Sequence, residues 1–266
     1  MSRILAIGMV AATLLGAAFG SARAAEPLVL RIAYEDKEQF PNYLGASTAI
    51  DPDKPGVSVE LVKMVGAALG LEIKLSRMPW PRCLSGLQKG EVDAIFNSSF
   101  KEERLINGAY PMKDGKLDSH RRITTISYFL YRQKGAAIGW DGKAFANLTG
   151  VIGAPLGYSI VGDLNKLGVK VEETPDTSGN FKKLRLGRLA GVAAQDVTAD
   201  QILKKGGFAD IEKVAPSIST KDYFVMISHP FLEAHRDVAE AFWTKLGEIR
   251  DAKSEELVHR YAEPVN

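Results

Sequence analysis

A weak internal repeat constrains the fold of this chain more than any other feature of its sequence. The hexapeptide LGLEIK at residues 69–74 recurs in pattern as LGVKVE at 167–172, and LQKGEV at 87–92 recurs as LRLGRL at 184–189. The offset between the copies stays at 97 or 98 residues. Because self-similarity at a fixed offset indicates duplicated structure, we expect two similar units.

Each unit is expected to alternate strands and helices. Leu61, Met64, Val65 and Ala68 follow the i, i+3, i+4, i+7 spacing of a helix, and residues 71–75 alternate as a strand does. The neighbouring segments predict a first strand at residues 29–33, a short helix opened by Pro81, and a buried strand at 92–96. This alternation predicts an α/β fold, and a 45% share of hydrophobic residues can fill its core.

Polar residues follow the last strand of each unit. Asn97, Ser98 and Ser99 come after the apolar run 92–96, and the 97-residue offset places residues 194–196 at the equivalent point. Ligands of open α/β sheets bind outside the carboxyl ends of the strands, so two facing units would put these groups on opposite walls of one cleft. The competing interpretation is that they belong to ordinary loops.

Arg104 lies where an anion could bind. Ser99 opens the spacing of a capping box, so a helix is expected to begin there with Arg104 in its early turns. A cation at that place opposes the helix dipole, and a bound carboxylate would remove the misfit. The sequence PLGYS at 155–159 offers a second helix N-terminus, where Tyr158 and Ser159 would meet the same anion. Alternatively, Ser99 only caps a helix and Arg104 is solvated.

Two further side chains are candidates for contact with a ligand. Asp196 follows an apolar strand and would attract an ammonium group if it faced the cleft, or it could cap a helix beginning near Thr198. Trp80 stands on a rigid turn between Pro79 and Pro81, which suits an aromatic platform for a ligand as well as a core tryptophan.

Signatures of enzymes and metal sites are weak. GYSIVG at 157–162 has a valine where the G-x-S-x-G motif needs its second glycine. Neither a phosphate loop nor a dinucleotide fingerprint is present. The single cysteine, Cys83, is expected to be a packed thiol. No metal-ligand spacing relates the four histidines, His120, His229, His235 and His259. We therefore expect no catalytic residue, no metal and no cofactor.

Residues 1–24 predict export. The apolar stretch 4–19 follows a basic residue, is shorter than the ~20 residues of a spanning helix, and precedes the small-x-small sequence ARA at 22–24. A signal peptide cleaved after Ala24 or Ala25 would leave a periplasmic protein. Its removal lowers Lys+Arg from 34 to 32, which equals the Asp+Glu count of 32, so no net charge would recruit nucleic acid.

Four segments, in order, resemble one known family. They are PGVSVELVKMVGAALGLEIKL (55–75), PWPRCLSGLQKGEVDAIFNSSFKEER (79–104), LTGVIGAPLGYS (148–159) and LRLGRLAGVAAQD (184–196). Together they resemble the periplasmic solute-binding proteins of ABC importers, in the amino-acid-binding branch. The resemblance covers essentially the whole chain after the signal peptide. It implies two α/β lobes, with residues 25–127 and 226–266 in lobe 1, residues 128–225 in lobe 2, and crossings near 124–132 and 220–227.

The resemblance also implies roles for individual residues. Trp80 stands where the family places a ligand-stacking aromatic, and Arg104 where it places the arginine that grips an α-carboxylate. Ser159 and the backbone of Tyr158 resemble the carboxylate donors of the second lobe, and Asp196 resembles the residue that receives an α-ammonium. The other implied cleft residues are Tyr34, Glu35, Asn97, Ser98 and Ser99. Residues 110–122 are longer than usual in the family, which leaves the substrate open.

The function implied by the resemblance is capture of a small polar solute, an amino acid or a related amine or carboxylate. Closure of a hinge around the solute would present it to an ABC permease in the inner membrane, with the binding protein a monomer. Two alternatives stay open. Periplasmic dehydratases of cyclic acids share the scaffold and would use Glu35 or Asp196 as a general acid. The third possibility is a docking partner of a periplasmic redox enzyme.

Overall fold

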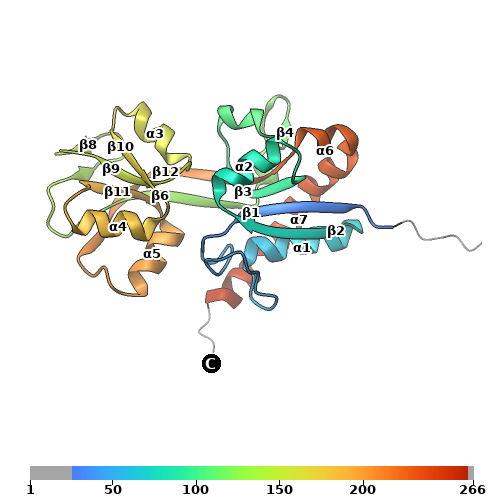
Figure 1. Ribbon diagram of the computed structural model, residues 1–266, viewed down its shortest axis with the longest axis horizontal. Coiled ribbons are helices and arrows are strands. Elements are labelled where there is room, and N and C mark those ends of the chain that lie inside the picture. Colours follow the sequence, from blue (N-terminus) through green and yellow to red (C-terminus); the bar gives the residue numbers. More distant parts are fainter. Residues whose placement is uncertain (1–25, 263–266) are drawn as a thin grey trace, which may run out of the picture.

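The computed structural model describes residues 26–262, which form two lobes joined by two long strands (Figure 1). The predicted signal peptide and its cleavage site lie outside the described residues. The predicted two-lobed α/β architecture is confirmed. Among residues 26–262, no helix combines the length and the apolar character that crossing a bilayer requires.

The predicted repeat is present as two units of the same topology. The first unit contains β1 (Val29–Glu35), α1 (Val57–Leu69), β2 (Glu72–Met78), α2 (Trp80–Gln88) and β3 (Ala94–Ser99). The second contains β9 (Ile152–Pro155), α3 (Ile160–Lys166), β10 (Val171–Thr174), α4 (Thr177–Arg185) and β11 (Gly191–Gln195), followed by α5 (Asp196–Lys204). In each unit the first strand pairs in parallel with the other two. The carboxyl ends of the six strands therefore face the space between the lobes, as the repeat predicted.

Two antiparallel strands connect the lobes and join both units into one sheet. β6 (Thr124–Gln133) and β12 (Ile211–Ile227) pair with each other, and the strand order is β10-β9-β11-β6-β12-β3-β1-β2. Figure 1 shows both strands running from one lobe to the other. The predicted crossings near 124–132 and 220–227 fall within these strands. The exact lobe boundaries stay a prediction.

The remaining helices and hairpins lie outside the two repeated units. Lobe 1 also carries the short helices η1 (Glu102–Ile106) and η2 (Ser119–Arg121), the hairpin β4 (Met112–Lys113) with β5 (Lys116–Leu117), and the C-terminal helices α6 (His229–Ala234) and α7 (Arg236–Ala262). Lobe 2 carries the hairpin β7 (Gly139–Trp140) with β8 (Phe145–Ala146).

The polar stretch after Phe96 is part of a strand, which corrects the prediction that it follows one. Ser98 and Ser99 lie in β3 because β12 pairs with them, Tyr223 opposite Ser99 and Phe224 opposite Ser98. Consequently Ser99 caps no helix. The next helix is the short η1, and α5 begins at Asp196 instead of near Thr198.

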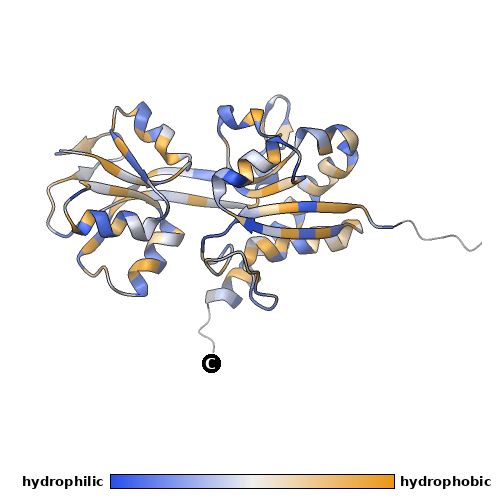
Figure 2. Cartoon of the chain, viewed as in Figure 1, coloured by the Kyte–Doolittle hydropathy of each residue, from blue (hydrophilic) through white to orange (hydrophobic). Residues whose placement is uncertain are grey.

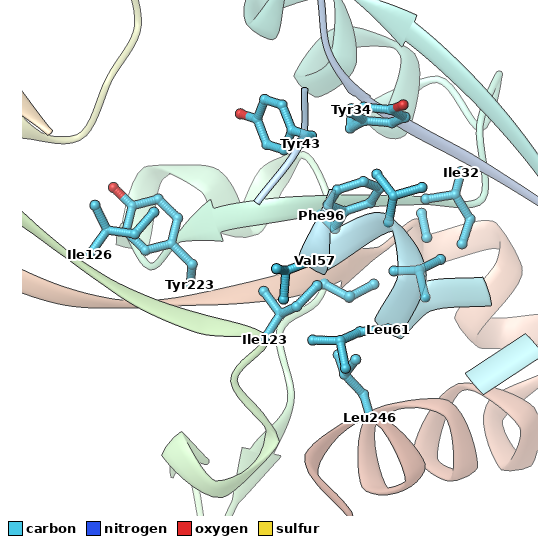
Figure 3. Close-up of a cluster of buried hydrophobic side chains, with 14 of the residues drawn as sticks. Ile32, Tyr34, Tyr43, Val57, Leu61, Phe96, Ile123, Ile126, Tyr223 and Leu246 are labelled. Atoms are coloured by element: carbon cyan, nitrogen blue, oxygen red, sulfur yellow. The ribbon is translucent and has the colours of Figure 1, made fainter. Parts of the chain in front are cut away.

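The core lies between the sheet and the flanking helices. Hydrophobic residues are frequent in the strands of both lobes (Figure 2). In lobe 1, Ile32 and Phe96 of the sheet, Leu61 of α1 and Leu246 of α7 belong to one buried cluster (Figure 3). Each of these four side chains is at most 1% exposed. This packing fixes the strands whose ends carry the candidate site.

Candidate functional site

A small cavity lies between the lobes, where the strand ends meet. Lobe 1 lines it with Glu35, Gln39, Tyr43, Trp80, Asn97, Ser99 and Arg104, lobe 2 with Tyr158, Ser159 and Gln195, and the connecting strands with Tyr128 and Tyr223. None of these lining side chains is aliphatic. Its volume is about 10 Å³, roughly the room needed for one water molecule. A solute therefore has access only when the lobes separate or side chains rotate.

Seven of the ten predicted site residues line this cavity. They are Glu35, Trp80, Asn97, Ser99, Arg104, Tyr158 and Ser159. Of the two adjacent serines, Ser99 lines the cavity and Ser98 does not. The contacts of these residues with a solute stay predictions.

The structure does not bring Tyr34, Ser98 and Asp196 to the cavity wall. Tyr34 and Ser98 point to the other face of their strands, and Asp196 begins the helix α5. Tyr34 is 1% exposed and stacks on Phe96 in the core, with ring centroids 4.7 Å apart (Figure 3). The Ser98 hydroxyl lies 2.9 Å from that of Tyr110. The carboxylate of Asp196 accepts a hydrogen bond from the next backbone N–H in α5 at 2.8 Å.

Five cavity residues were missed by the sequence analysis, namely Gln39, Tyr43, Tyr128, Gln195 and Tyr223. Gln195 stands inside the repeated segment 194–196, and Tyr128 and Tyr223 stand inside the predicted crossings, so position alone could have indicated these three. Gln39 and Tyr43 lie in the irregular segment between β1 and α1, which carries no periodic signal.

Arg77 holds that irregular segment in place. Its guanidinium, on β2, donates to the carbonyl oxygens of Gly45 at 2.6 Å and Leu44 at 2.7 Å, and to that of Glu35 at 3.2 Å. The side chain is only 4% exposed. A buried cation satisfied by several backbone carbonyls fixes the loop that brings Gln39 to the cavity.

Arg104 is the positive group of the site. It is 6% exposed, its Nη1 donates to the carbonyl oxygen of Ser99 at 2.8 Å, and its Nη2 donates across the cleft to the carbonyl oxygen of Gly157 at 3.0 Å. The guanidinium carbon lies 5.3 Å from the centre of the Trp80 ring. No carboxylate among the described residues forms an ion pair with Arg104. A buried guanidinium without a counter-charge is complementary to an anion.

Two hydroxyls lie beside Arg104, one from each lobe. Ser99 Oγ donates to Ser159 Oγ at 2.8 Å, and Arg104 Nη1 lies 3.2 Å from Ser99 Oγ. Lys221 of β12 donates to Ser159 Oγ at 3.1 Å and pairs with Asp163 at 2.5 Å. Burial lowers the pKa of Lys221, although Asp163 acts in the opposite direction. The wall near Arg104 therefore offers hydroxyl and cationic donors.

Glu35 is the negative group. It is 3% exposed, and its Oε2 accepts hydrogen bonds from Tyr158 at 2.5 Å and Tyr43 at 3.3 Å. Among the described residues nothing donates to its buried Oε1, and the Lys37 ammonium lies 3.7 Å away. Burial raises the pKa of Glu35, which the hydrogen bond from Tyr158 and the charge of Lys37 only partly oppose. This oxygen can accept from a donor on a solute.

A chain of amides and hydroxyls crosses the cleft between these two charges. Gln39 Nε2 donates to Gln195 Oε1 at 2.6 Å, and Gln195 Nε2 donates to the hydroxyl of Tyr223 at 2.7 Å. Asn97 Nδ2 donates to Gln39 Oε1 at 2.7 Å, while Asn97 Oδ1 is buried with no donor among the described residues. Glu35 and Asn97 thus each present one acceptor oxygen to which no described residue donates a hydrogen bond.

The described residues hold no group of three or more His, Cys, Asp or Glu side chains that could bind a metal. The chemistry that the arrangement offers is recognition: a cation and two hydroxyls at one place, and a carboxylate with an unpartnered oxygen at another.

Comparison with known proteins supports the architecture. The sequence model for bacterial extracellular solute-binding proteins, family 3, matches residues 42–108, which confirms the predicted resemblance over that part of the chain. No curated protein matches the chain. Residues 42–108 include Tyr43, Trp80, Asn97, Ser99 and Arg104 of the cavity wall.

Solved structures share the whole fold. An ancestral arginine-binding protein bound to glutamine is 20% identical, with a TM-score of 0.66 over 88% of this chain and 97% of that one. An amino-acid ABC transporter substrate-binding protein from Streptococcus pneumoniae bound to L-arginine is 16% identical, with a TM-score of 0.66 over 88% and 94%. A histidine kinase sensor domain with similarity to periplasmic binding proteins is 16% identical, with a TM-score of 0.68 over 88% and 96%. At these identities the comparison shows the two-lobed fold.

Proposed function

We propose that this chain is a family 3 solute-binding protein that holds a small zwitterion, an amino acid or a close relative, between its lobes. Two of the three named neighbours of the same fold are complexes with amino acids, one with glutamine and one with L-arginine. As a periplasmic monomer, the protein would deliver its solute to an ABC permease.

One observation carries this proposal: two buried groups of opposite charge line one cavity, and neither has all of its ion-pairing or hydrogen-bonding positions filled within the protein. Arg104 has no carboxylate partner among the described residues, and Glu35 has an oxygen without a donor. A solute with a carboxylate and an ammonium group satisfies both, and each charge-assisted hydrogen bond is stronger than a neutral one. A solute with only one charge would leave either Arg104 without a counter-charge or Glu35 Oε1 without a hydrogen-bond donor.

Binding would be coupled to movement of the lobes about β6 and β12. With the lobes apart, Arg104 and Glu35 of lobe 1 are exposed to solvent and to the solute. Closure brings Tyr158 and Ser159 of lobe 2 over the bound molecule, as in hinge-type binding proteins. In the closed form, the solute carboxylate would replace the Gly157 carbonyl as acceptor for Arg104.

Thermal unfolding of the protein with a panel of solutes tests this proposal. The panel contains the standard amino acids, simple carboxylates without an amine, and amines without a carboxylate. An amino acid that binds should stabilise the protein by ~2.7 kcal/mol at a hundred times its dissociation constant, and should be recovered unchanged. Failure of every amino acid to raise the melting temperature would contradict the proposal.

A second candidate, a lyase acting on a cyclic acid, has one specific observation in its favour. Burial raises the pKa of Glu35, as the general acid of such a reaction requires. Chromatography after incubation distinguishes the two functions, because a lyase consumes its ligand whereas a binding protein returns it unchanged.

A further inference from the structure

A second and larger cavity adjoins the first. It has a volume of about 530 Å³ and lies between the segment after β1 in lobe 1 and the helices α4 and α5 in lobe 2. Figure 1 shows these helices on the side of lobe 2 where that segment approaches. Tyr158 lines both cavities. Its hydroxyl bonds to Glu35 in the small cavity, and this side chain is the shared wall.

The small cavity provides charged groups for a solute, and the large cavity provides volume. The small one presents Arg104 and Glu35 but encloses only about 10 Å³. The large one has a volume typical of ligand pockets, which occupy roughly 300–1,000 Å³. A solute whose charged groups bind in the first cavity therefore has room for a longer tail on the far side of Tyr158.

Most of the charged side chains that line the large cavity already have partners within the protein. Lys205 pairs with Glu38 at 2.5 Å, and Lys37 donates to the carbonyl oxygen of Pro175. Both contacts join lobe 1 to lobe 2. The four residues involved line the cavity, so these groups are satisfied within the protein.

Two further carboxylates, those of Asp36 and Asp176, line the large cavity and take no part in these contacts. Asp176 accepts a hydrogen bond from the Gly179 backbone at 2.7 Å as the N-cap of α4. Asp36 also lines the cavity, and no side chain of the described residues pairs with its carboxylate. It directly follows Glu35, whose carboxylate lines the small cavity, so consecutive residues serve the two cavities. Asp36 is the acceptor left for a cationic tail.

We infer that the large cavity receives the far end of an elongated solute, and that this end carries a positive charge, an ammonium or guanidinium group, held by Asp36. This inference rests on the proposed function, since the head of the same solute binds Arg104 and Glu35. Thr177, Ser178 and Gln201 supply neutral hydrogen-bonding groups on the opposite wall. A neutral tail would fit the volume but would leave Asp36 without a partner.

Calorimetric titration with three probes tests the inference: L-arginine, its neutral isostere L-citrulline, and the short L-serine. A hydrogen bond to a charged group contributes more to the binding free energy than a neutral one. The wild type should therefore bind L-arginine more tightly than L-citrulline by a factor of about ten or more. Asp36→Asn should bring the two affinities together. Asp53→Asn, an exposed aspartate of the same segment that does not line the cavity, should preserve their ratio.

A steric variant tests occupancy of the cavity independently of charge. Gln201→Trp on α5 fills part of the large cavity. It should lower the affinities for L-arginine and L-citrulline by similar factors, and the affinity for L-serine much less. Lys204→Trp is the matched control, because Lys204 lies on the same helix, is exposed and lines no part of the cavity.

Each outcome has a distinct meaning. Equal affinities of the wild type for L-arginine and L-citrulline, or a preference that survives Asp36→Asn, would overturn the cationic tail. Long probes that bind to Gln201→Trp as well as to the wild type would overturn occupancy of the large cavity. In both cases continued binding of L-serine leaves the proposed function intact. If none of the three probes binds, the cationic tail is overturned, and the thermal panel of all amino acids decides the proposed function separately.

Discussion

Lobe 1 and lobe 2 place three parallel strands in the same order, β2-β1-β3 and β10-β9-β11, with their carboxyl ends at the same cavity. Their side chains at those ends differ. Lobe 1 contributes the charged pair Glu35 and Arg104, whereas lobe 2 contributes the uncharged Tyr158, Ser159 and Gln195.

This difference indicates a division of labour between two copies of one topology. Recognition of charge belongs to lobe 1, which can engage a solute while the lobes are apart. Lobe 2 adds neutral hydrogen bonds and excludes water on closure, which strengthens the charge interactions already made. Variants of the two lobes should therefore affect binding to different extents.

The largest effect is expected from Arg104→Ala in lobe 1. Truncation would leave a solute carboxylate buried without its partner, at a cost of ~2–5 kcal/mol, which is roughly thirtyfold to several thousandfold in affinity. Arg82→Ala on the exposed side of α2 should leave affinity unchanged. Calorimetry with the amino acid that gives the highest thermal shift measures both. Normal affinity of Arg104→Ala would remove this residue from the site.

The carboxylates of the two lobes can be compared directly through Glu35→Gln and Asp196→Asn. Glu35→Gln should weaken the binding of an amino acid by about tenfold or more, because it removes the negative charge that accepts a hydrogen bond from the ammonium group. The second should change affinity by about twofold at most, because Asp196 bonds to the N-terminus of its own helix, away from the cavity. The opposite order of effects would return the ammonium site to lobe 2.

Trp80 should report solute binding with a smaller energetic effect. Trp80→Phe keeps an aromatic ring beside Arg104 and should weaken binding by roughly 0.5–1.5 kcal/mol. Trp80→Ala is a less selective test, since Trp80 also packs against Cys83 and Leu87 in a buried cluster. The fluorescence change on saturation should disappear in Trp80→Phe and persist in Trp140→Phe. Persistence in both variants would place the reporting tryptophan elsewhere.

The smallest effect concerns stability without solute. Burial raises the pKa of Glu35, so the folded protein binds this proton more tightly than the unfolded chain does. The stability contributed by Glu35 is therefore fully present below its unfolded pKa and is lost as pH rises through the higher folded pKa. In urea unfolding, Glu35→Gln should be more stable than the wild type at pH ~7, and the difference should shrink toward pH ~4. A difference that is independent of pH would show that Glu35 is not charged at a cost in the folded protein.

The repeat, the alternation of strands and helices and the two crossings were predictable from sequence, because each leaves a local or periodic pattern. The three predicted residues that miss the cavity, Tyr34, Ser98 and Asp196, each stand next to one that lines it. For Tyr34 and Ser98 the reason is that side chains alternate across a strand, so a difference of one residue changes the face completely. Asp196 misses the cavity because the chain turns into α5 at this residue. Sequence patterns located the strand ends but not the faces.

Other features depend on contacts between distant parts of the chain. Whether Ser98 and Ser99 lie in a strand or a loop is decided by pairing with β12, more than 120 residues away. Gln39 and Tyr43 reach the cavity because Arg77 of β2 binds the carbonyl groups of their loop. Neither contact has a signature at short range, so the sequence could not indicate them.

Calorimetric titration of the wild type with L-serine, with ethanolamine, which lacks the carboxylate, and with hydroxypropionate, which lacks the amine, tests most directly whether two opposite charges of lobe 1 select a zwitterion. L-serine should bind more tightly than either analogue by about tenfold or more, since ethanolamine leaves Arg104 without a counter-charge and hydroxypropionate leaves Glu35 Oε1 without a hydrogen-bond donor. Binding of hydroxypropionate as tight as that of L-serine would contradict this account, because Glu35 would then have no part in recognition.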